Sequence, residues 1–141
     1  MTAKEYLGQA YRIDQRINSK LEQIMTLREL ALKATSTLTD MPHSPTKNTS
    51  SMQNIICKIV DLADDINKDI DMLVDLKREI VYALKKIQHT EYQTLLELRY
   101  LCFKTWEQIA VDMGYSSKHV FYLHDKAVAL LQIPKSSYHL G

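Results

Sequence analysis

The chain has 141 residues, which is enough for one domain or two very small ones. Its 45% hydrophobic and 25% charged residues are ordinary for a globular protein, and a formal net charge of +1 points to no class of partner. No apolar run approaches the roughly 20 residues of a membrane span and no signal-type stretch opens the chain, so we expect a cytoplasmic protein without membrane contacts.

The residue types that carry catalysis or bind metals show no motif spacing. Cys57 and Cys102 are expected to be buried, reduced thiols, because a zinc site needs about four converging ligands. The five histidines lack ligand or triad spacing, and His119 and His124 are expected at the surface. Glycine-rich phosphate loops and nucleophiles set beside a base are missing. We therefore predict no enzyme activity, no catalytic residue, no metal and no cofactor.

The first predicted element is a helix over residues 3–37, because the low glycine and proline content favours long helices. Its apolar residues recur at steps of three and four and form one stripe. They are Tyr6, Ala10, Ile13, Ile17, Leu21, Ile24, Leu27, Ala31, Ala34 and Leu38. Residues 39–50 hold two prolines and many small polar residues, so we expect a loop there.

A second helix is predicted over residues 51–88, which would form an antiparallel hairpin with the first one. Its stripe is wider than one partner helix would cover. The additional apolar residues are Ile56, Val60, Ala63, Met72, Val74 and Val81. Either the C-terminal domain or a second copy of the hairpin would cover them, and the second case would make the protein a homodimer.

The charge of the second helix is uneven. Its aspartates gather in the first half, at positions 61, 64, 65, 69, 71 and 75, and its basic residues follow. The simplest interpretation is a solvated helix face. The alternative is an electrostatic contact with a basic partner or a paired subunit.

Three shorter helices are predicted over residues 90–101, 105–113 and 116–132. Gly114 supplies a tight turn between the last two, and Ser116 is placed to cap the helix that follows. Two short helices joined in this way form the pattern of a helix-turn-helix, whose second helix lies in the major groove of DNA.

Capping boxes, in which Ser or Thr is followed three residues later by Glu or Gln, occur near the heads of four predicted helices. They are Thr2/Glu5, Ser50/Gln53, Thr90/Gln93 and Thr105/Gln108. Pro134 ends the last helix. The predicted fold is therefore all-α, with a helical hairpin over 1–88, a helix-turn-helix domain over 89–134 and a frayed tail over 135–141.

The C-terminal third resembles region 4 of the sigma-70 family, the part of a sigma factor that recognises the promoter −35 element. The residues that carry the resemblance are Leu98-Arg99-Tyr100, Thr105 with Gln108-Ile109-Ala110, Gly114 with Ser116 and Val120, and Ala127 with Leu130-Leu131. Gln108 stands where the family usually has glutamate. The whole chain also resembles small sigma-like prophage proteins of Gram-positive bacteria, which are related to ArpU-type regulators of late phage transcription.

In a helix-turn-helix, side chains in the first turns of the second helix reach base edges. Lys118 is suited to donate to guanine or to a phosphate, and Phe121 to touch a thymine methyl group. The flanking lysines would contact phosphates and set the register. The predicted DNA-binding residues are Lys104, Thr105, Ser116, Ser117, Lys118, His119, Phe121, Tyr122 and Lys126.

Other residues of this segment are predicted to build its core. Trp106 is expected to pack between the helices, and Arg99 to be structural, paired with an acidic neighbour. The residues expected to face inward on the last helix are Val120, Leu123, Ala127, Leu130 and Leu131.

Two functions remain open. Residues 90–141 carry five basic and five acidic side chains, so the segment alone should bind DNA weakly. We expect a phage transcription regulator that acts with RNA polymerase or another partner. The alternative is a protein-interaction adaptor that keeps the fold without DNA readout, since Phe121 and Tyr122 stand where sigma region 4 usually has arginines.

Overall fold

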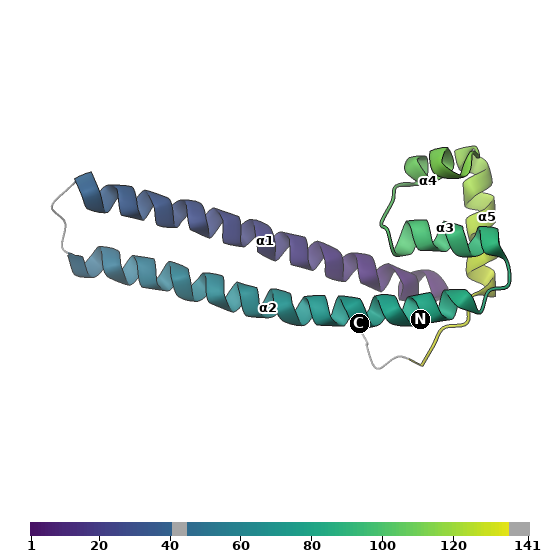
Figure 1. The fold of residues 1–141 in the computed structure, drawn as a ribbon, viewed down its shortest axis with the longest axis horizontal. Coiled ribbons are helices and arrows are strands. Elements are labelled where there is room, and N and C mark those ends of the chain that lie inside the picture. The colour runs from purple at the N-terminus through teal and green to yellow at the C-terminus, as the bar shows by residue number, and fades with distance from the viewer. Residues whose placement is uncertain (41–44, 136–141) are drawn as a thin grey trace. The chain divides into compact units, whose positions relative to one another are not determined.

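The computed structural model describes residues 1–40 and 45–135, and side chains of residues 1–35 and 50–135 (Figure 1). Within these ranges the chain forms helices and no strand, which confirms the all-α class. The helices are α1 (Ala3–Asp40), α2 (Pro45–Lys85), α3 (Thr90–Tyr100), α4 (Trp106–Met113) and α5 (Ser117–Leu130). In the described part of the chain, no helix has the length and apolar character needed to cross a membrane.

Two of the four predicted capping boxes are present. The Thr2 backbone N–H donates to the Glu5 carboxylate, and the Glu5 N–H donates back to the Thr2 hydroxyl, each over 3.2 Å. The same reciprocal pair joins Thr105 and Gln108 at the start of α4. These bonds satisfy backbone donors that have no partner inside the helix, and so they fix where α1 and α4 begin.

The prediction of a Thr90/Gln93 capping box is wrong. The N-cap of α3 is His89, which makes no side-chain capping bond. The Gln93 side-chain amide instead donates to the backbone carbonyl of Ile87, just beyond the end of α2. Gln93 therefore satisfies a carbonyl behind α3 and does not close a box at its start.

The predicted loop over 39–50 is wrong at both ends. Helix α1 continues to Asp40 and α2 begins at Pro45, while residues 41–44 lie outside the described residues. Proline is compatible with the first helical position, where its missing N–H would have no partner in any case. The Ser50/Gln53 pair consequently lies inside α2 and caps nothing.

The chain divides into two units, which we describe separately. Unit 1 comprises Met1–Asp14 with Met72–Gly141, and unit 2 comprises Gln15–Asp71. Unit 1 thus takes the first turns of α1 and the last turns of α2 together with α3, α4 and α5. The described residues of unit 2 belong to α1 and α2.

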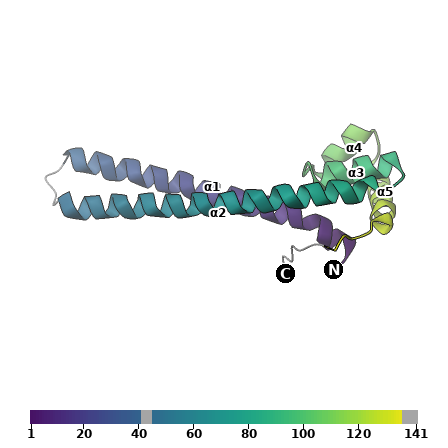
Figure 2. The same cartoon turned by 60° about the horizontal axis from the view of Figure 1, so that its bottom comes forward.

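In unit 2, α1 and α2 lie side by side (Figures 1 and 2) and are joined by an ion triad. The Asp69 carboxylate accepts from Arg16 at 2.6 Å and from Lys20 at 2.7 Å. Asp69 is only 4% exposed, so its assignment to a solvated aspartate face is wrong. Leu21, expected in the buried stripe of α1, is 45% exposed.

The core of unit 1 receives buried residues from all five helices, including the first turns of α1. Tyr6, Ala10 and Ile13 are buried as the α1 stripe predicts, and the Tyr6 hydroxyl donates to Glu79 of α2 at 2.9 Å. Leu7 and Gln9 are buried as well, although they lie off that stripe. The first turns of α1 are therefore covered on more than one side, which a single apolar stripe does not predict.

Candidate functional site

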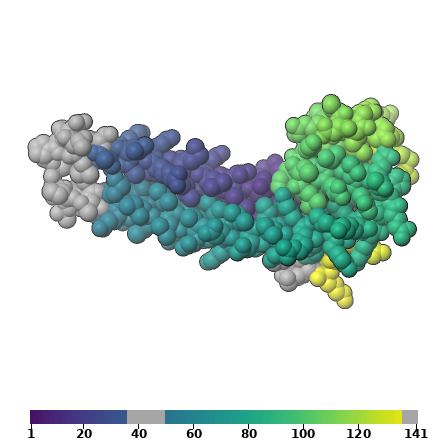
Figure 3. All heavy atoms as spheres, viewed as in Figure 1, coloured from purple at the N-terminus to yellow at the C-terminus, as the bar shows by residue number. Residues whose placement is uncertain are grey.

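Helices α3, α4 and α5 pack around a small apolar cluster in unit 1. The cluster consists of Leu95, Ile109, Ala110, Val120 and Leu123, with Tyr92, Leu98, Trp106 and Met113 packed against it. We call these nine residues the α3–α5 core. The cluster takes side chains from all three helices, so α5 is held by residues of both α3 and α4. In Figure 3 the atoms of this segment form one continuous green surface.

The turn between α4 and α5 has the predicted chemistry. Gly114 adopts φ +71°, and its N–H reaches the carbonyls of Ala110 and Val111 at the end of α4. The Tyr115 N–H also donates to the Ala110 carbonyl, at 2.9 Å. The Ser116 hydroxyl then accepts from the His119 N–H at 3.2 Å and caps α5. A left-handed glycine followed by a serine cap sets the direction in which α5 leaves the turn.

Trp106 is an anchor of this fold, as predicted. Its ring lies 5.0 Å from that of Phe121 and 4.8 Å from that of His124, measured between centroids. The Arg99 guanidinium covers the same ring at 4.3 Å and donates to the Lys104 carbonyl. Arg99 is therefore structural as expected, but it contacts an aromatic ring and a backbone carbonyl rather than an acid.

His124 is buried, so its expected surface position is wrong. It is 4% exposed, and its Nε2 lies 2.6 Å from the Tyr100 hydroxyl of α3. Burial is the main cause that lowers its pKa to about 4, with the Lys4 charge adding to it and Asp125 opposing it. The neutral imidazole thus links α3, α4 and α5.

Three further expectations about burial are wrong. Cys57 and Cys102 are exposed free thiols rather than buried ones. Leu130, expected to face inward, is 54% exposed, whereas Leu131 is buried as expected.

The exposed side of α5 carries a row of rings. Tyr115 meets His119 edge-on at 4.6 Å, and His119 stacks with Tyr122 at 6.0 Å. The Lys126 ammonium lies 5.0 Å from the Tyr122 ring. We call Tyr115, His119 and Tyr122 the α5 aromatic row. All three rings are exposed, so the row is an amphipathic surface with a cation at one end.

Four of the predicted DNA-binding residues lie on this exposed side or next to it. Lys118, His119 and Tyr122 come from the first turns of α5, and Lys126 follows one turn later; all four are exposed. Ser117, the first residue of α5, is exposed too.

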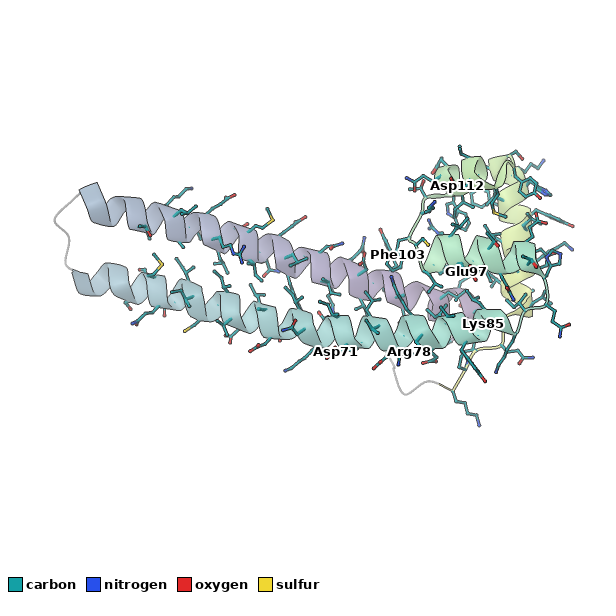
Figure 4. The ribbon with its side chains drawn as sticks, in the orientation of Figure 1. Asp71, Arg78, Lys85, Glu97, Phe103 and Asp112 are labelled. Carbon is teal, nitrogen blue, oxygen red and sulfur yellow. The ribbon has the colours of Figure 1, made fainter. Side chains whose placement is uncertain are left out.

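The other predicted DNA-binding residues have contacts within unit 1. Lys104 forms an ion pair with Asp112 of α4 at 2.6 Å (Asp112 is labelled in Figure 4), and this hydrogen bond raises the pKa of Lys104. Thr105 and Ser116 use their hydroxyls as helix caps. Phe121 packs on Trp106 and keeps 45% of its surface exposed.

Sequence reasoning missed Tyr115. Its hydroxyl shares a hydrogen bond with Glu91 of α3, and this bond raises the pKa of the hydroxyl. The signal was present, because positions 115, 119, 122 and 126 are spaced by four, three and four residues, and side chains at these spacings are neighbours on a helix. Tyr115 precedes the helix predicted over residues 116–132, so the helical spacing of that segment does not include it.

Charge near the row is mixed. Asp125 of α5 is 71% exposed along its side chain and lies 3.7 Å from Lys4 of α1. The exposed residues of α5 therefore include an acidic group as well as Lys118 and Lys126, which fits the balanced charge of the segment.

A family model described as "Protein of unknown function (DUF1492)" matches residues 32–132, which is more than half of the chain. No curated protein and no solved structure matches the chain.

Proposed function

We propose that this chain, which belongs to the DUF1492 family, regulates transcription by binding DNA through α4 and α5. In this proposal α4, the Gly114–Ser116 turn and α5 act as a helix-turn-helix similar to sigma region 4, and α1 and α2 form an antiparallel hairpin. The protein would act in the cytoplasm of a bacterial host as part of a phage or prophage programme.

One observation carries the proposal: the first turns of α5 project polar and aromatic side chains outward while their inner side is locked into the α3–α5 core. Val120 and Leu123 are buried, whereas Lys118, His119 and Tyr122 on the same turns are exposed. A helix held in this way can enter the major groove without rearrangement. Lys118 is the side chain suited to a guanine edge, and Tyr122 to a phosphate.

The balanced charge favours a DNA contact that is assisted by a protein. Phosphate neutralisation supplies most non-specific affinity, and the Asp112 ion pair occupies Lys104. RNA polymerase is the partner that the resemblance to sigma region 4 implies, because a polymerase that already holds the promoter would supply the affinity that the segment lacks.

A second candidate is a protein-interaction adaptor. Val111 on α4 is 81% exposed, and Phe121 and Tyr122 are 45% and 54% exposed. Exposed apolar and aromatic side chains are common at protein contact sites. On this alternative α4 and α5 would contact a protein partner and no DNA.

Electrophoretic mobility shift with host and phage genomic fragments at two salt concentrations tests the proposal. Lys118→Ala should weaken binding to a selected fragment by about tenfold to a hundredfold while leaving non-specific binding nearly unchanged. Lys126→Ala should weaken all fragments alike and flatten the salt dependence by about one charge.

The matched control is Lys85→Ala, which removes the same charge from α2 (Figure 4) and should change binding little. If Lys118→Ala and Lys85→Ala weaken DNA binding equally, Lys118 does not recognise a base. If the full chain shifts no fragment at low salt, the DNA function is refuted. Retention of a protein partner that depends on Phe121 and Tyr122 would then favour the adaptor.

A further inference from the structure

Unit 2 has very little core of its own. Among its described side chains, the buried apolar ones are Ile17, Ile24 and Ile66, and the fourth buried residue is the ion-paired Asp69. In the described residues of this unit, 15–40 and 45–71, parts of two helices are present and no third element. Helices of this kind normally bury their apolar faces against a further layer, since two helices alone leave too much apolar surface in water.

The uncovered surface of α2 in this unit has a regular pattern. Ile56, Val60 and Ile70 are 52%, 51% and 42% exposed. With Ala63 and Asn67 they are spaced by alternate steps of four and three residues. We call these five residues the second α2 stripe. This spacing is the heptad repeat of a coiled coil, with Val60 and Asn67 at a positions and Ile56, Ala63 and Ile70 at d positions.

We propose that the second α2 stripe pairs with the same stripe of a second copy of this chain, with the two α2 helices parallel about a two-fold axis. Each copy keeps its own α1, so the dimer contains four helices at this point. Isoleucine at d disfavours an isolated two-stranded coil and favours higher helix numbers, which fits an assembly of four helices.

Asn67 identifies the occupant as a second copy. In a parallel two-fold pair, an a residue faces the same residue of the other chain, so the two Asn67 amides can hydrogen-bond to each other. A single asparagine at an a position fixes register and helix number in this way, at a cost in stability. In an antiparallel pair Asn67 would face an apolar d residue, such as Ala63 or Ile70, and would have no such amide partner.

The charges beside the stripe favour the same orientation. Asp64 and Asp71 occupy e positions, and both are exposed. In a parallel pair, the e positions of the two copies lie at opposite edges of the interface. In an antiparallel pair, the e positions of the two copies face each other. If the two helices cross near residue 65, Asp64 faces Asp64 of the other copy. If they cross near residue 68, Asp64 faces Asp71 of the other copy. Close like charges of this kind are repulsive, so parallel pairing is favoured.

Sedimentation equilibrium of the full chain tests the pairing. Wild type should be a dimer at tens of micromolar. Val60→Glu introduces a charge at the centre of the stripe and should raise the dimer dissociation constant by at least about a hundredfold. The matched control is Val111→Glu on α4, an equal change at an 81% exposed valine, which should leave the dimer unchanged. A monomeric wild type, or a Val60→Glu variant that dimerises like wild type, overturns the proposal.

Disulfide trapping tests the orientation of the two α2 helices. In a chain carrying Cys57→Ser and Cys102→Ser, Asn67→Cys should form a disulfide-linked dimer on mild oxidation, because parallel a positions come within the roughly 7 Å between Cα atoms that a disulfide needs. Asp65→Cys, which faces away from the stripe, should not. Equal trapping of both variants, or trapping of neither, overturns the parallel arrangement.

Discussion

Gly8 and Gly114 occupy two different backbone environments, although a side chain would fit at both. A Cβ atom added at either position would meet no atom within 4 Å. Gly8 lies inside α1 with ordinary helical geometry, whereas Gly114 has φ +71°. Steric space therefore does not distinguish them, and only backbone conformation does.

Alanine at the two positions should have opposite effects on stability. Gly8→Ala should raise the free energy of unfolding by about 0.5–1 kcal/mol, because alanine loses less chain entropy in a helix. Gly114→Ala should lower it by about 1–2 kcal/mol, because the left-handed conformation strains a residue with a Cβ. Urea unfolding followed by circular dichroism measures both. Effects of the same sign would show that the turn at Gly114 is not left-handed in solution.

His124 makes the stability of unit 1 dependent on pH. Its pKa is lowered to about 4 in the folded protein, mainly by burial, whereas an exposed histidine titrates near 6.5. A group whose folded pKa is lowered contributes stability that is fully present above its unfolded pKa. This contribution is lost as the pH falls from about 6.5 towards 4, by at most about 1.4 kcal/mol per pH unit.

Urea unfolding at a series of pH values between 7 and 4 would detect this loss. His124→Gln removes the titration and keeps a polar partner for Tyr100, so its stability should fall less over that range. His119→Gln is the control, since His119 is exposed and its variant should follow the wild-type curve. If both variants show the same acid dependence as wild type, His124 is not the group that titrates.

At the scale of the helices, two threonines that look alike in sequence have different roles. Thr105 caps α4 through its hydroxyl, while Thr90 is the first residue of α3 and makes no capping bond. Thr105→Ala should therefore cost about 1 kcal/mol, and Thr90→Ala less than about 0.5 kcal/mol. Thermal unfolding measured side by side would decide. A larger loss at Thr90 would mean that α3 begins one residue later than described.

The ion triad aligns α1 with α2. Burial alone would raise the pKa of the Asp69 carboxyl, but the hydrogen bonds from Arg16 and Lys20 outweigh this effect and lower it. Asp69→Asn should cost about 1.5–3 kcal/mol because two charge-assisted bonds are weakened. Asp65→Asn, which removes an exposed charge from the same helix, should stay within about 0.5 kcal/mol. Equal costs would mean that Asp69 is solvated.

The positions of α3, α4 and α5 were predictable from sequence to within two residues, because periodicity and turn chemistry are local signals. The turn at Gly114, the cap at Ser116 and the inward side of α5 at Val120 and Leu123 follow from side-chain chemistry and spacing alone. Burial of Asp69 and His124 was not predictable in this way. Each depends on partners distant in sequence, 49 to 53 residues away for Asp69 and 24 for His124.

The candidate site was predicted in part for the same reason. Exposed residues on the first turns of α5 were identified by position, but the roles of Lys104 and Phe121 depend on contacts with Asp112 and Trp106. Both residues have contacts within unit 1 that a pattern of residue types does not contain.

For the whole molecule, the two units should differ in local stability. Unit 1 holds most of the buried apolar residues, and unit 2 holds three among its described side chains. Hydrogen exchange at low protein concentration should therefore show easier opening for residues 15–35 and 50–71 than for α3 and α5. Raising the concentration should slow exchange in unit 2, because dimerisation stabilises the folded state by mass action. Exchange in unit 2 that is as slow as in unit 1, at every concentration, would contradict this picture.

Trp106 has a practical consequence because it is the only tryptophan in the chain. Indole fluorescence depends on the groups around the ring, and here these are Arg99, Phe121 and His124, one from α3 and two from α5. Emission from this single tryptophan therefore reports on the α3–α5 core. A protonated imidazole quenches a neighbouring indole, so the same signal would follow the titration of His124. Any ligand that moves Phe121 would change the emission as well, without a label.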